Sequence, residues 1–473
     1  MKFCPNCGKS INFEGSKFCY HCGFQLPFEV SSNENKINNF KINEKIKIYN
    51  DDAKIENGVL KSYTGDEEDI VLPDDVKVIG SYGFSNTYKY AKTITLNDGV
   101  TEIKEKAFYS IPTVTKIFIP KTVTKIDERA FFVGFDNPTN QFIGCVSLTE
   151  IVVDEKNPKY KSINGDLYTK DGTTLLKYAP GKTNKEFVLP KGVEKISFVA
   201  GLVNCNHLSK IVLPSTFGNN GEFILKLPDQ EKPIEIEIDK NNPNYKMIDG
   251  HVYSKDGKTF SLYNIGKKGK TFIVPDSVKR IDDCAFSYSS LKTIVIPEGV
   301  TEIGEYAFSD CYDLTSITLP NTIKSMGISA FANCENLKSI TLPSNLKMIE
   351  NGTFDACGIQ NITIPTGIQE IDDFAFINCD IQNVIIPSTV KKLGEGAFDQ
   401  CHNLENITLS NGLEIISNEA FSYCSKLKAI TIPSSVKQIG EDVFIGCDNL
   451  KTIIISSGKK YNNLPKNIKI IEC

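Results

Sequence analysis

Residues 314–336 read LTSITLPNTIKSMGISAFANCEN, and this stretch decides the fold. Apolar residues at Leu314, Ile317 and Leu319 alternate with serine and threonine, which predicts a short, half-buried strand. Pro320 ends the predicted strand, because proline has no N–H group to give to a strand ladder.

The second half of this stretch turns back toward the interior. Ile323 and Met326 form a second small apolar group, and Ala330, Phe331 and Cys334 follow at helix-like spacing. This spacing predicts one short helical or 3₁₀ turn before the pattern starts again.

The same pattern recurs every 22 or 23 residues. Cysteines keep the period at Cys311, Cys334, Cys357, Cys379, Cys401, Cys424 and Cys447. Phenylalanines keep it at Phe286, Phe308, Phe331, Phe354, Phe376, Phe398, Phe421 and Phe444. A fixed period of this length indicates a solenoid, whose repeats bury their apolar sides only against neighbouring repeats. The expected fold is therefore a mainly β repeat solenoid with short helical or 3₁₀ turns.

The in-phase residues are interpreted as packing elements. A small residue beside a large one, as in the recurring Ala-Phe pair, suits layered packing around a phenylalanine core. A buried free cysteine behaves as a small apolar residue. We expect a reduced, buried cysteine ladder, with a disulfide chain or a metal ladder as the alternatives. Replacing Cys379 with serine is then expected to bury a hydroxyl without a certain partner.

We call the 22- to 23-residue pattern of in-phase phenylalanines and cysteines the lattice. Its regularity divides the chain into a less regular and a more regular part. We expect irregular repeats with inserted hairpins over 51–290, and regular repeats with a C-terminal cap over 291–473. Residues 132–147 and 215–233 interrupt the period and are expected to form irregular loops.

Two insertions resemble each other at an offset of 85 residues, one from Asn157 to Tyr178 and one from Asn242 to Tyr263. Each contains Lys-Asp-Gly between alternating apolar residues, which is typical of a β-hairpin. A shorter echo, Asn57-Gly58, opens the array. These segments are expected to project from the coil edge as hairpins.

The pattern over roughly residues 55–455 resembles the BspA-type leucine-rich repeats, with the consensus L-x-x-I-x-I-P-x-x-V-x-x-I-x-x-x-A-F-x-x-C. The resemblance implies a right-handed leucine-rich-repeat solenoid with a strand ladder on one face. It also implies protein binding and, in some bacteria, adhesion at the cell surface.

The N-terminal segment has a different pattern. Cysteines stand in two C-x₂-C pairs within residues 1–26, at Cys4, Cys7, Cys19 and Cys22. Four thiolates at this spacing can close a tetrahedral site, and the segment resembles short zinc-ribbon domains. We expect one structural Zn²⁺, with iron or unligated thiols as the alternatives. His21 is expected to lie outside the complete ligand shell, and residues 27–50, rich in Asn, Lys, Glu and Ser, are expected to form a flexible linker.

Charge and targeting signals narrow the partner and the compartment. The net charge is −5, with 53 basic and 58 acidic residues, so the charge of the whole chain gives no electrostatic support for nucleic acid or an anionic membrane as a partner. Neither a secretory signal nor a membrane span is evident, and the 15 cysteines fit a reducing compartment. The expected location is cytoplasmic, with the cell surface as the alternative.

Catalytic motifs are not evident, so we expect a protein that is not an enzyme and has no small-molecule substrate. None of the histidines at His21, His207, His251 and His402 sits in a nucleophile or metal motif.

A protein partner is expected to bind the outward positions of the strands. One column of these positions holds Val295, Thr318, Thr341, Thr363, Ile385, Thr408 and Thr431, and the next holds Thr293, Ser316, Ser339, Asn361, Asn383, Asn406 and Ala429. The candidate contact residues are Ser316, Thr318, Ser339, Thr341, Asn361, Thr363, Asn383, Asn406, Thr408 and Thr431. Threonine also favours exposed strands for structural reasons alone.

Three functions follow as hypotheses. The favoured one is a non-enzymatic protein-interaction scaffold with a structural zinc ribbon. The alternatives are an exported cell-surface or host-contact adhesin of the BspA type, and a nucleic-acid adaptor directed by the ribbon.

Overall fold

The computed structural model describes residues 2–3, 10–11, 52–85, 90–131, 144–197, 202, 205, 207–219, 234–264 and 269–473. The chain divides into two compact units, Met1–Lys47 and Ile48–Cys473. In the first unit β1 (Lys2–Phe3) pairs antiparallel with β2 (Ser10–Ile11). The predicted linker over 27–50 lies outside the described residues.

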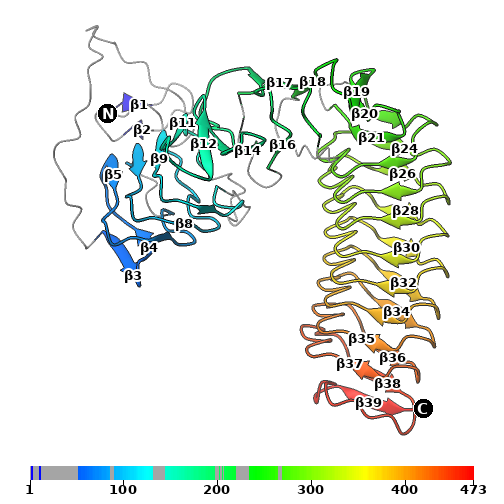
Figure 1. Ribbon diagram of the computed structural model, residues 1–473. Coiled ribbons are helices and arrows are strands. Elements are labelled where there is room, and N and C mark those ends of the chain that lie inside the picture. Colours follow the sequence, from blue (N-terminus) through cyan, green and yellow to red (C-terminus); the bar gives the residue numbers. More distant parts are fainter. Residues whose placement is uncertain are drawn as a thin grey trace, which may run out of the picture. The chain divides into compact units, whose positions relative to one another are not determined.

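The second unit is a β-solenoid in which most coils contribute one longer and one shorter strand (Figure 1). The longer strands pair in parallel and in register, so that Ile294 lies opposite Ile317. They are β5 (Asp69–Val71), β7 (Thr93–Thr95), β9 (Lys116–Ile119), β11 (Glu150–Val153), β15 (Glu186–Val188), β17 (Lys210–Leu213), β18 (Glu235–Ile238), β22 (Thr271–Ile273), β24 (Thr293–Val295), β26 (Ser316–Thr318), β28 (Ser339–Thr341), β30 (Asn361–Thr363), β32 (Asn383–Ile386), β34 (Asn406–Leu409), β36 (Ala429–Ile432), β38 (Thr452–Ile455) and β39 (Lys469–Glu472).

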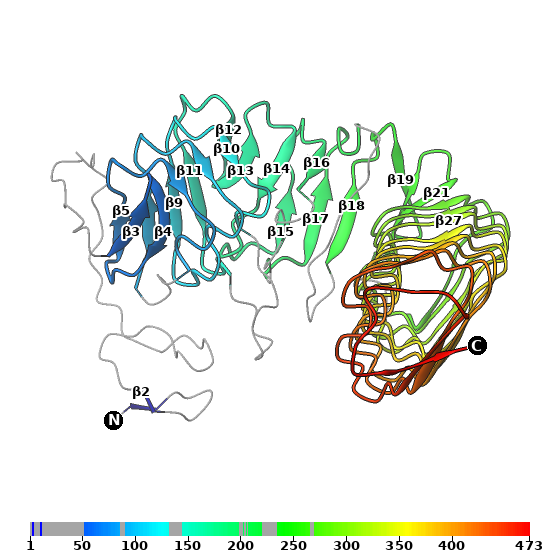
Figure 2. The ribbon, with the colours of Figure 1, turned by 90° about the horizontal axis from the view of Figure 1, so that it is seen from below.

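The shorter strands form a second set of parallel ladders. They are β6 (Val78–Ile79), β8 (Glu102–Ile103), β10 (Lys125–Ile126), β16 (Lys195–Ile196), β23 (Arg280–Ile281), β25 (Glu302–Ile303), β27 (Ser325–Met326), β29 (Met348–Ile349), β31 (Glu370–Ile371), β33 (Lys392–Leu393), β35 (Ile415–Ile416) and β37 (Gln438–Ile439). The predicted solenoid is therefore confirmed. Seen along the stack, the coils from residue 269 onward superimpose closely (Figure 2).

The two related insertions are three-stranded antiparallel meanders. The first comprises β12 (Tyr160–Ile163), β13 (Asp166–Thr169) and β14 (Thr174–Lys177), and the second β19 (Tyr245–Ile248), β20 (His251–Ser254) and β21 (Thr259–Leu262). A simpler hairpin, β3 (Ala53–Glu56) with β4 (Val59–Tyr63), opens the array through the Asn57-Gly58 turn.

The hairpin prediction is correct, but the prediction that these segments project from the coil edge is wrong. The last strand of each meander joins the ladder of shorter strands, because β14 pairs in parallel with β16 and β21 with β23. The first turn of each meander uses Asn164-Gly165 or Asp249-Gly250, all four residues at positive φ, as a tight hairpin turn requires. The Lys-Asp-Gly segments form the second turns.

The prediction of a short helical or 3₁₀ turn is wrong. The segment forms instead an irregular corner, which we call the Ala-Phe corner and which comprises residues 329–334 in one coil. The described residues contain no helix, and Ser329 and Asn333 have φ of 51° and 59°. Backbone N–H groups alternate in direction along the corner. Those of Ser329, Phe331 and Asn333 donate to the next coil, at Asn351, Thr353 and Asp355. Those of Ala330, Ala332 and Cys334 donate back three residues, to Gly327, Ser329 and Phe331.

The corner therefore acts as a third hydrogen-bonded ladder between coils. A helix would direct its N–H groups along its own axis, whereas this corner satisfies half of them through the neighbouring coil. The positive φ angles of Ser329 and Asn333 lie at two of the three positions whose N–H groups bond to the neighbouring coil.

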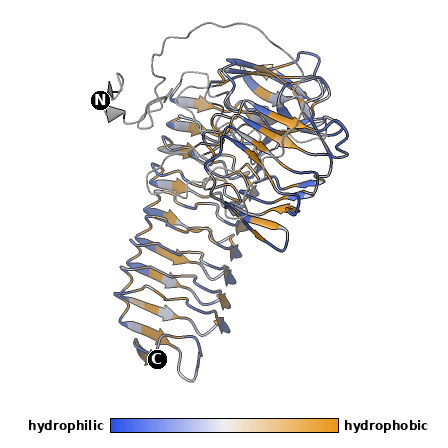
Figure 3. Ribbon diagram, turned by 90° about the vertical axis from the view of Figure 1, so that its left-hand side faces the viewer, coloured by the Kyte–Doolittle hydropathy of each residue, from blue (hydrophilic) through white to orange (hydrophobic). Residues whose placement is uncertain are grey.

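The core of the regular repeats is a continuous stack of phenylalanine rings, as predicted. Successive rings from Phe260 to Phe444 lie 4.7–6.0 Å apart between centroids, with interplanar angles of 8–20°. Phe84, Phe108 and Phe131 form a shorter stack of the same kind. Apolar residues recur on the strand of each coil (Figure 3), because the inward strand positions are the aliphatic ones.

Replacing Phe376 with alanine should destabilise the solenoid by about 3–5 kcal/mol, because it removes a fully buried ring from the stack. Thr363→Ala, at an exposed strand position, is the matched control and should change stability little. Chemical denaturation of both variants measures the effect. An unchanged unfolding midpoint for Phe376→Ala would contradict the layered core.

Candidate partner-binding face

The ten predicted contact residues all lie at outward strand positions, and all are exposed. We call them the strand face: Ser316 and Thr318 on β26, Ser339 and Thr341 on β28, Asn361 and Thr363 on β30, Asn383 on β32, Asn406 and Thr408 on β34, and Thr431 on β36. Strand pairing aligns them, since Ser339 lies opposite Asn361 and Thr341 opposite Thr363. Within each sheet the outward residues therefore lie in register, as the two columns predict.

An asparagine ladder lies at the centre of the strand face. Asn361 lies opposite Asn383, and Asn383 lies opposite Asn406. The Nδ2 of Asn406 donates to the Oδ1 of Asn383 at 2.8 Å. An amide side chain has two donor hydrogens and an acceptor oxygen with two lone pairs. One bond within the ladder therefore leaves capacity for hydrogen bonds to a partner.

Ile385 interrupts the threonine column with an apolar side chain. It lies on β32 opposite Thr408, and it is 64% exposed. The sequence places Ile385 in the column, yet a polarity criterion leaves it out of the candidate contacts. The signal in the sequence is an isoleucine at an outward strand position between Thr363 and Thr408 of the same column.

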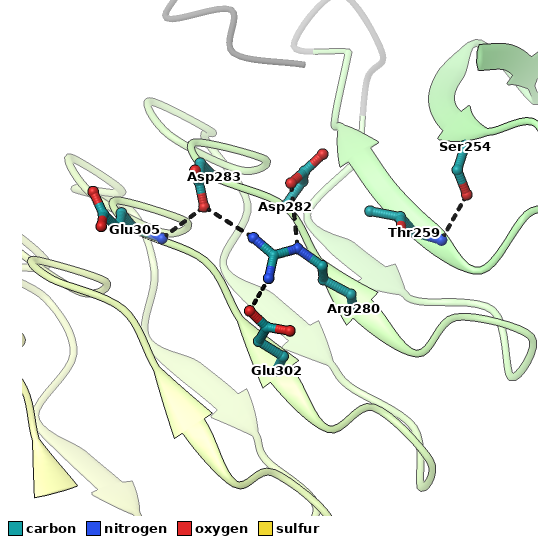
Figure 4. Close-up of polar contacts among 7 residues, drawn as sticks. All are labelled: Ser254, Thr259, Arg280, Asp282, Asp283, Glu302 and Glu305. Carbon is teal, nitrogen blue, oxygen red and sulfur yellow. Dashed lines mark hydrogen bonds and ion pairs between the residues drawn. The ribbon is translucent and has the colours of Figure 1, made fainter. Parts of the chain in front are cut away.

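A network of charges marks the start of the regular repeats (Figure 4). Arg280 on β23 lies between three carboxylates: its guanidinium is 3.4 Å from Asp282, 3.3 Å from Asp283, and also contacts Glu302 of the next coil. Asp283 accepts the backbone N–H of Glu305 at 3.0 Å. Burial raises the pKa of Asp282, and the charge of Arg280 opposes that rise. The arrangement ties adjacent coils together.

The cysteine ladder has a bonding role that the sequence reasoning missed. Each lattice thiol donates from Sγ to the backbone carbonyl of the phenylalanine in the preceding coil, at 2.9–3.2 Å. Cys379, for example, donates to the carbonyl of Phe354 at 2.9 Å. The expectation that a serine at 379 would find no certain partner is therefore wrong, because this carbonyl faces the side chain.

Burial also decides the protonation of these thiols. It raises the pKa of Cys401 to about 12, with a smaller lowering from the backbone of Cys379, and it raises that of Cys379 well above its ordinary value. A protonated thiol is a donor and a poor nucleophile. The lattice cysteines are buried free thiols, which confirms their assignment to the core.

The predicted zinc ligands Cys4, Cys7, Cys19 and Cys22 lie outside the described residues. Within the part of the chain that the structure does describe, no group of three or more His, Cys, Asp or Glu side chains could hold a metal ion. No helix there is long and apolar enough to cross a membrane.

Comparison with known proteins gives a family match over most of the solenoid. A family model described as a BspA type leucine rich repeat region matches residues 53–161, 259–381 and 347–468. No curated protein sequence gives a significant match.

Solved structures of leucine-rich repeat proteins also match. One from Eubacterium ventriosum is 23% identical, covers 85% of this chain and 94% of its own, and has a TM-score of 0.41. A leucine rich cell surface protein from Faecalibacterium prausnitzii is 24% identical over 74% of this chain and 90% of its own, with a TM-score of 0.35. A leucine rich repeat protein of T. pallidum is 26% identical over 44% of this chain and 86% of its own, with a TM-score of 0.34.

Alkylation at pH 9 should distinguish the exposed thiol from the lattice thiols. Cys473 is exposed and Cys401 is buried, and a thiolate is the reactive species. Iodoacetamide should therefore modify Cys473 in the folded protein and Cys401 only after unfolding. Peptide mapping by mass spectrometry measures both, and rapid labelling of Cys401 in the folded protein would contradict its burial.

The stability of the protein should fall as the pH rises above about 9. Burial raises the pKa of Cys401 to about 12 in the folded state, against an ordinary value of 9.0. Its contribution to stability is therefore complete below pH 9 and is lost between pH 9 and 12. At pH 10 the loss for this one thiol is about 1 kcal/mol.

The matched comparison is Cys401→Ala, which lacks the titrating group. The difference in unfolding free energy between the wild type and this variant should shrink by about 1 kcal/mol between pH 7 and pH 10. A constant difference would show that burial does not shift this thiol.

Proposed function

Since the chain belongs to the BspA-type leucine-rich repeat family, we propose that it is a non-enzymatic interaction scaffold that binds a protein partner along the strand face. The single observation behind this proposal is that ten outward side chains on six neighbouring strands are exposed, uncharged and aligned. Solenoids commonly bind partners over extended surfaces of this kind.

The chemistry of the strand face suits a partner that contributes backbone or amide groups. Covering neutral hydroxyl and amide groups costs less free energy than covering charges, provided that hydrogen bonds replace those to water. The threonine and asparagine side chains of β26 to β36 supply both donors and acceptors. The partner surface is therefore polar and uncharged where it meets the two columns.

Ile385 supplies the apolar contribution to the proposed interface. It stands 64% exposed among threonines and opposite Thr408. Burying an aliphatic side chain fully is worth about 1.5–3 kcal/mol. Binding energy in interfaces concentrates on a few such anchors that a ring of polar contacts surrounds. We place the anchor of the interface at this residue.

The proposal includes a structural Zn²⁺ held by Cys4, Cys7, Cys19 and Cys22. The paired C-x₂-C spacing and the chemistry of four thiolates support it. The antiparallel strands β1 and β2 bracket Cys4 and Cys7 in the sequence. A segment of this length buries little apolar surface, so the metal would supply much of its folding free energy.

A reducing compartment, and hence the cytoplasm, is the proposed location. Its support is chemical: the lattice cysteines are buried thiols that act as hydrogen-bond donors. Protease treatment of intact native cells tests the location. Full protection of the chain agrees with it, whereas digestion from outside would favour the surface adhesin.

A charged variant of the strand face should lose the partner. The variant carries Thr363→Glu, Ile385→Glu and Thr408→Glu, which put carboxylates on an outward column without touching the core. The control carries Ser325→Glu, Gln369→Glu and Gln438→Glu at exposed positions of the shorter-strand side, with the same change in net charge.

Affinity capture from native extract, quantified by mass spectrometry, measures the loss. A partner retained by the wild type and the control but reduced at least tenfold with the strand-face variant supports the proposal. Equal retention by all three proteins, with unchanged melting temperatures, would contradict it.

Metal analysis of the purified full chain should give about one zinc per molecule, as one closed four-thiolate site requires. A Cys4→Ser and Cys22→Ser double variant should lose that zinc, while Cys447→Ser should keep it because Cys447 lies in the solenoid core. Iron in place of zinc, or metal that persists in the double variant, would refute the assignment.

A further inference from the structure

A pocket opens where the first meander meets the preceding coil. Its volume is about 180 Å³. Its apolar wall is formed by Ile126, Phe131, Leu167 and Leu176, and its polar rim by Asp127, Glu128, Tyr160, Thr169 and Ser197. These residues come from β10 and its following turn, from all three strands of the meander, and from the residue after β16.

The pocket arises from an interruption of the shorter-strand ladder. β10 is the last strand of one sheet, and β12 is the first of a separate sheet that continues through β13 and β14 to β16. The meander thus stands where the next coil would pack on β10. The hydroxyl of Tyr160 spans part of the gap and accepts the backbone N–H of Ile126 at 2.9 Å.

The second meander shows that such a junction can also be closed. Tyr245 occupies the position of Tyr160, and it is only 6% exposed. Its ring lies so close to Gly218 that a Cβ there would stand 2.2 Å from a ring carbon. The ring therefore fills the second junction, whereas Tyr160 is half-buried and leaves the first one open.

Asp127 and Glu128 on the rim form no direct ion pair within the described residues, whereas the equivalent Asp282 and Asp283 do. The motif Ile-Asp-Glu at 126–128 corresponds to Ile-Asp-Asp at 281–283. In the latter, Arg280 pairs with both aspartates, and Asp283 also caps the N–H of the next coil.

Around the pocket the situation differs. The residue at the position of Arg280 is Lys125, and its Nζ lies 2.8 Å from Glu102 of the preceding coil. Asp127 accepts the N–H of Arg129 in its own turn. Within the described part of the chain, no cation forms an ion pair with Asp127 or Glu128. Lys125 attracts Asp127 without a direct contact, because its ammonium is paired with Glu102. The two carboxylates therefore stand at the rim of an apolar cavity without an ion pair of their own in the described residues.

We propose that this pocket binds an ammonium group on a short aliphatic stem. The stem would lie against Phe131, Leu167 and Leu176, and the ammonium would lie at the rim beside Asp127 and Glu128. A cavity of about 150 Å³ with apolar walls holds a ligand the size of benzene, so this pocket has room for a four-carbon stem. The inference is independent of the strand face. The ammonium can come from a lysine side chain of another protein or from a free alkylamine.

Ligand-observed NMR titration of the full chain with n-butylammonium tests the proposal. We expect a Kd of about 1–10 mM, as befits a ligand of so few atoms. Its neutral counterpart, 1-butanol, should bind at least threefold more weakly. Asp127→Asn with Glu128→Gln should abolish this preference for the ammonium.

The control variant is Glu395→Gln with Glu441→Gln, which removes two exposed carboxylates from the corresponding turns of later coils. It should keep the wild-type preference. Equal binding of amine and alcohol, an equal loss in both variants, or no binding of either ligand would overturn the proposal.

Two further ligands identify the source of the ammonium. Nα-acetyl-lysine methylamide carries the stem on a peptide backbone, and cadaverine carries it free. Binding of the lysine derivative at the strength of n-butylammonium assigns the pocket to a protein side chain. Binding of cadaverine alone assigns it to a free amine, and the failure of both contradicts the proposal.

Discussion

The structure depends on the contact between the corners of successive coils. At each corner a phenylalanine ring stacks on the ring before it, as Phe376 does on Phe354 at 5.3 Å. The thiol beside it, Cys379, donates to the carbonyl of that same preceding phenylalanine. The backbone N–H of Phe376 donates in the other direction, to Ala397. Each coil is therefore bonded to both neighbouring coils at its Ala-Phe corner. The solenoid can be extended only by coils that repeat this corner.

This constraint explains how much of the fold could be predicted. Stacking of the coils requires the alternation around Ile317 and the fixed period of phenylalanine and cysteine. Because both patterns are visible in the sequence, the strands, the core and the exposed columns could be inferred from it. The corner at 329–334 could not, because Ala330, Phe331 and Cys334 have the spacing of a helix. Only the neighbouring coil, which accepts alternate N–H groups, decides against the helix.

The candidate sites also differ in whether local sequence or contacts between separate segments determine them. The exposure of the strand face follows from local alternation of apolar and polar residues. The same alternation places Ile385 at an outward position beside it, but the apolar side chain was not among the predicted polar contacts. The pocket beside Asp127 was not predictable, because it is formed where Phe131, Leu167 and Ser197 meet from separate segments. The donor role of Cys379 likewise requires knowledge of which carbonyl lies opposite its thiol. The regular repeat thus determines the strand face, and the interruption of the shorter-strand ladder after β10 creates the pocket.

Hydrogen exchange at the corners tests the central claim most directly. The account predicts that amides in peptides spanning 329–334, 351–357 and 373–379 exchange as slowly as those of the adjoining longer strands, because half of them bond to the next coil. Their protection should be lost together with that of the strands. Fast exchange at these corners beside protected strands would contradict the account, since the coils would then be joined by their strands alone.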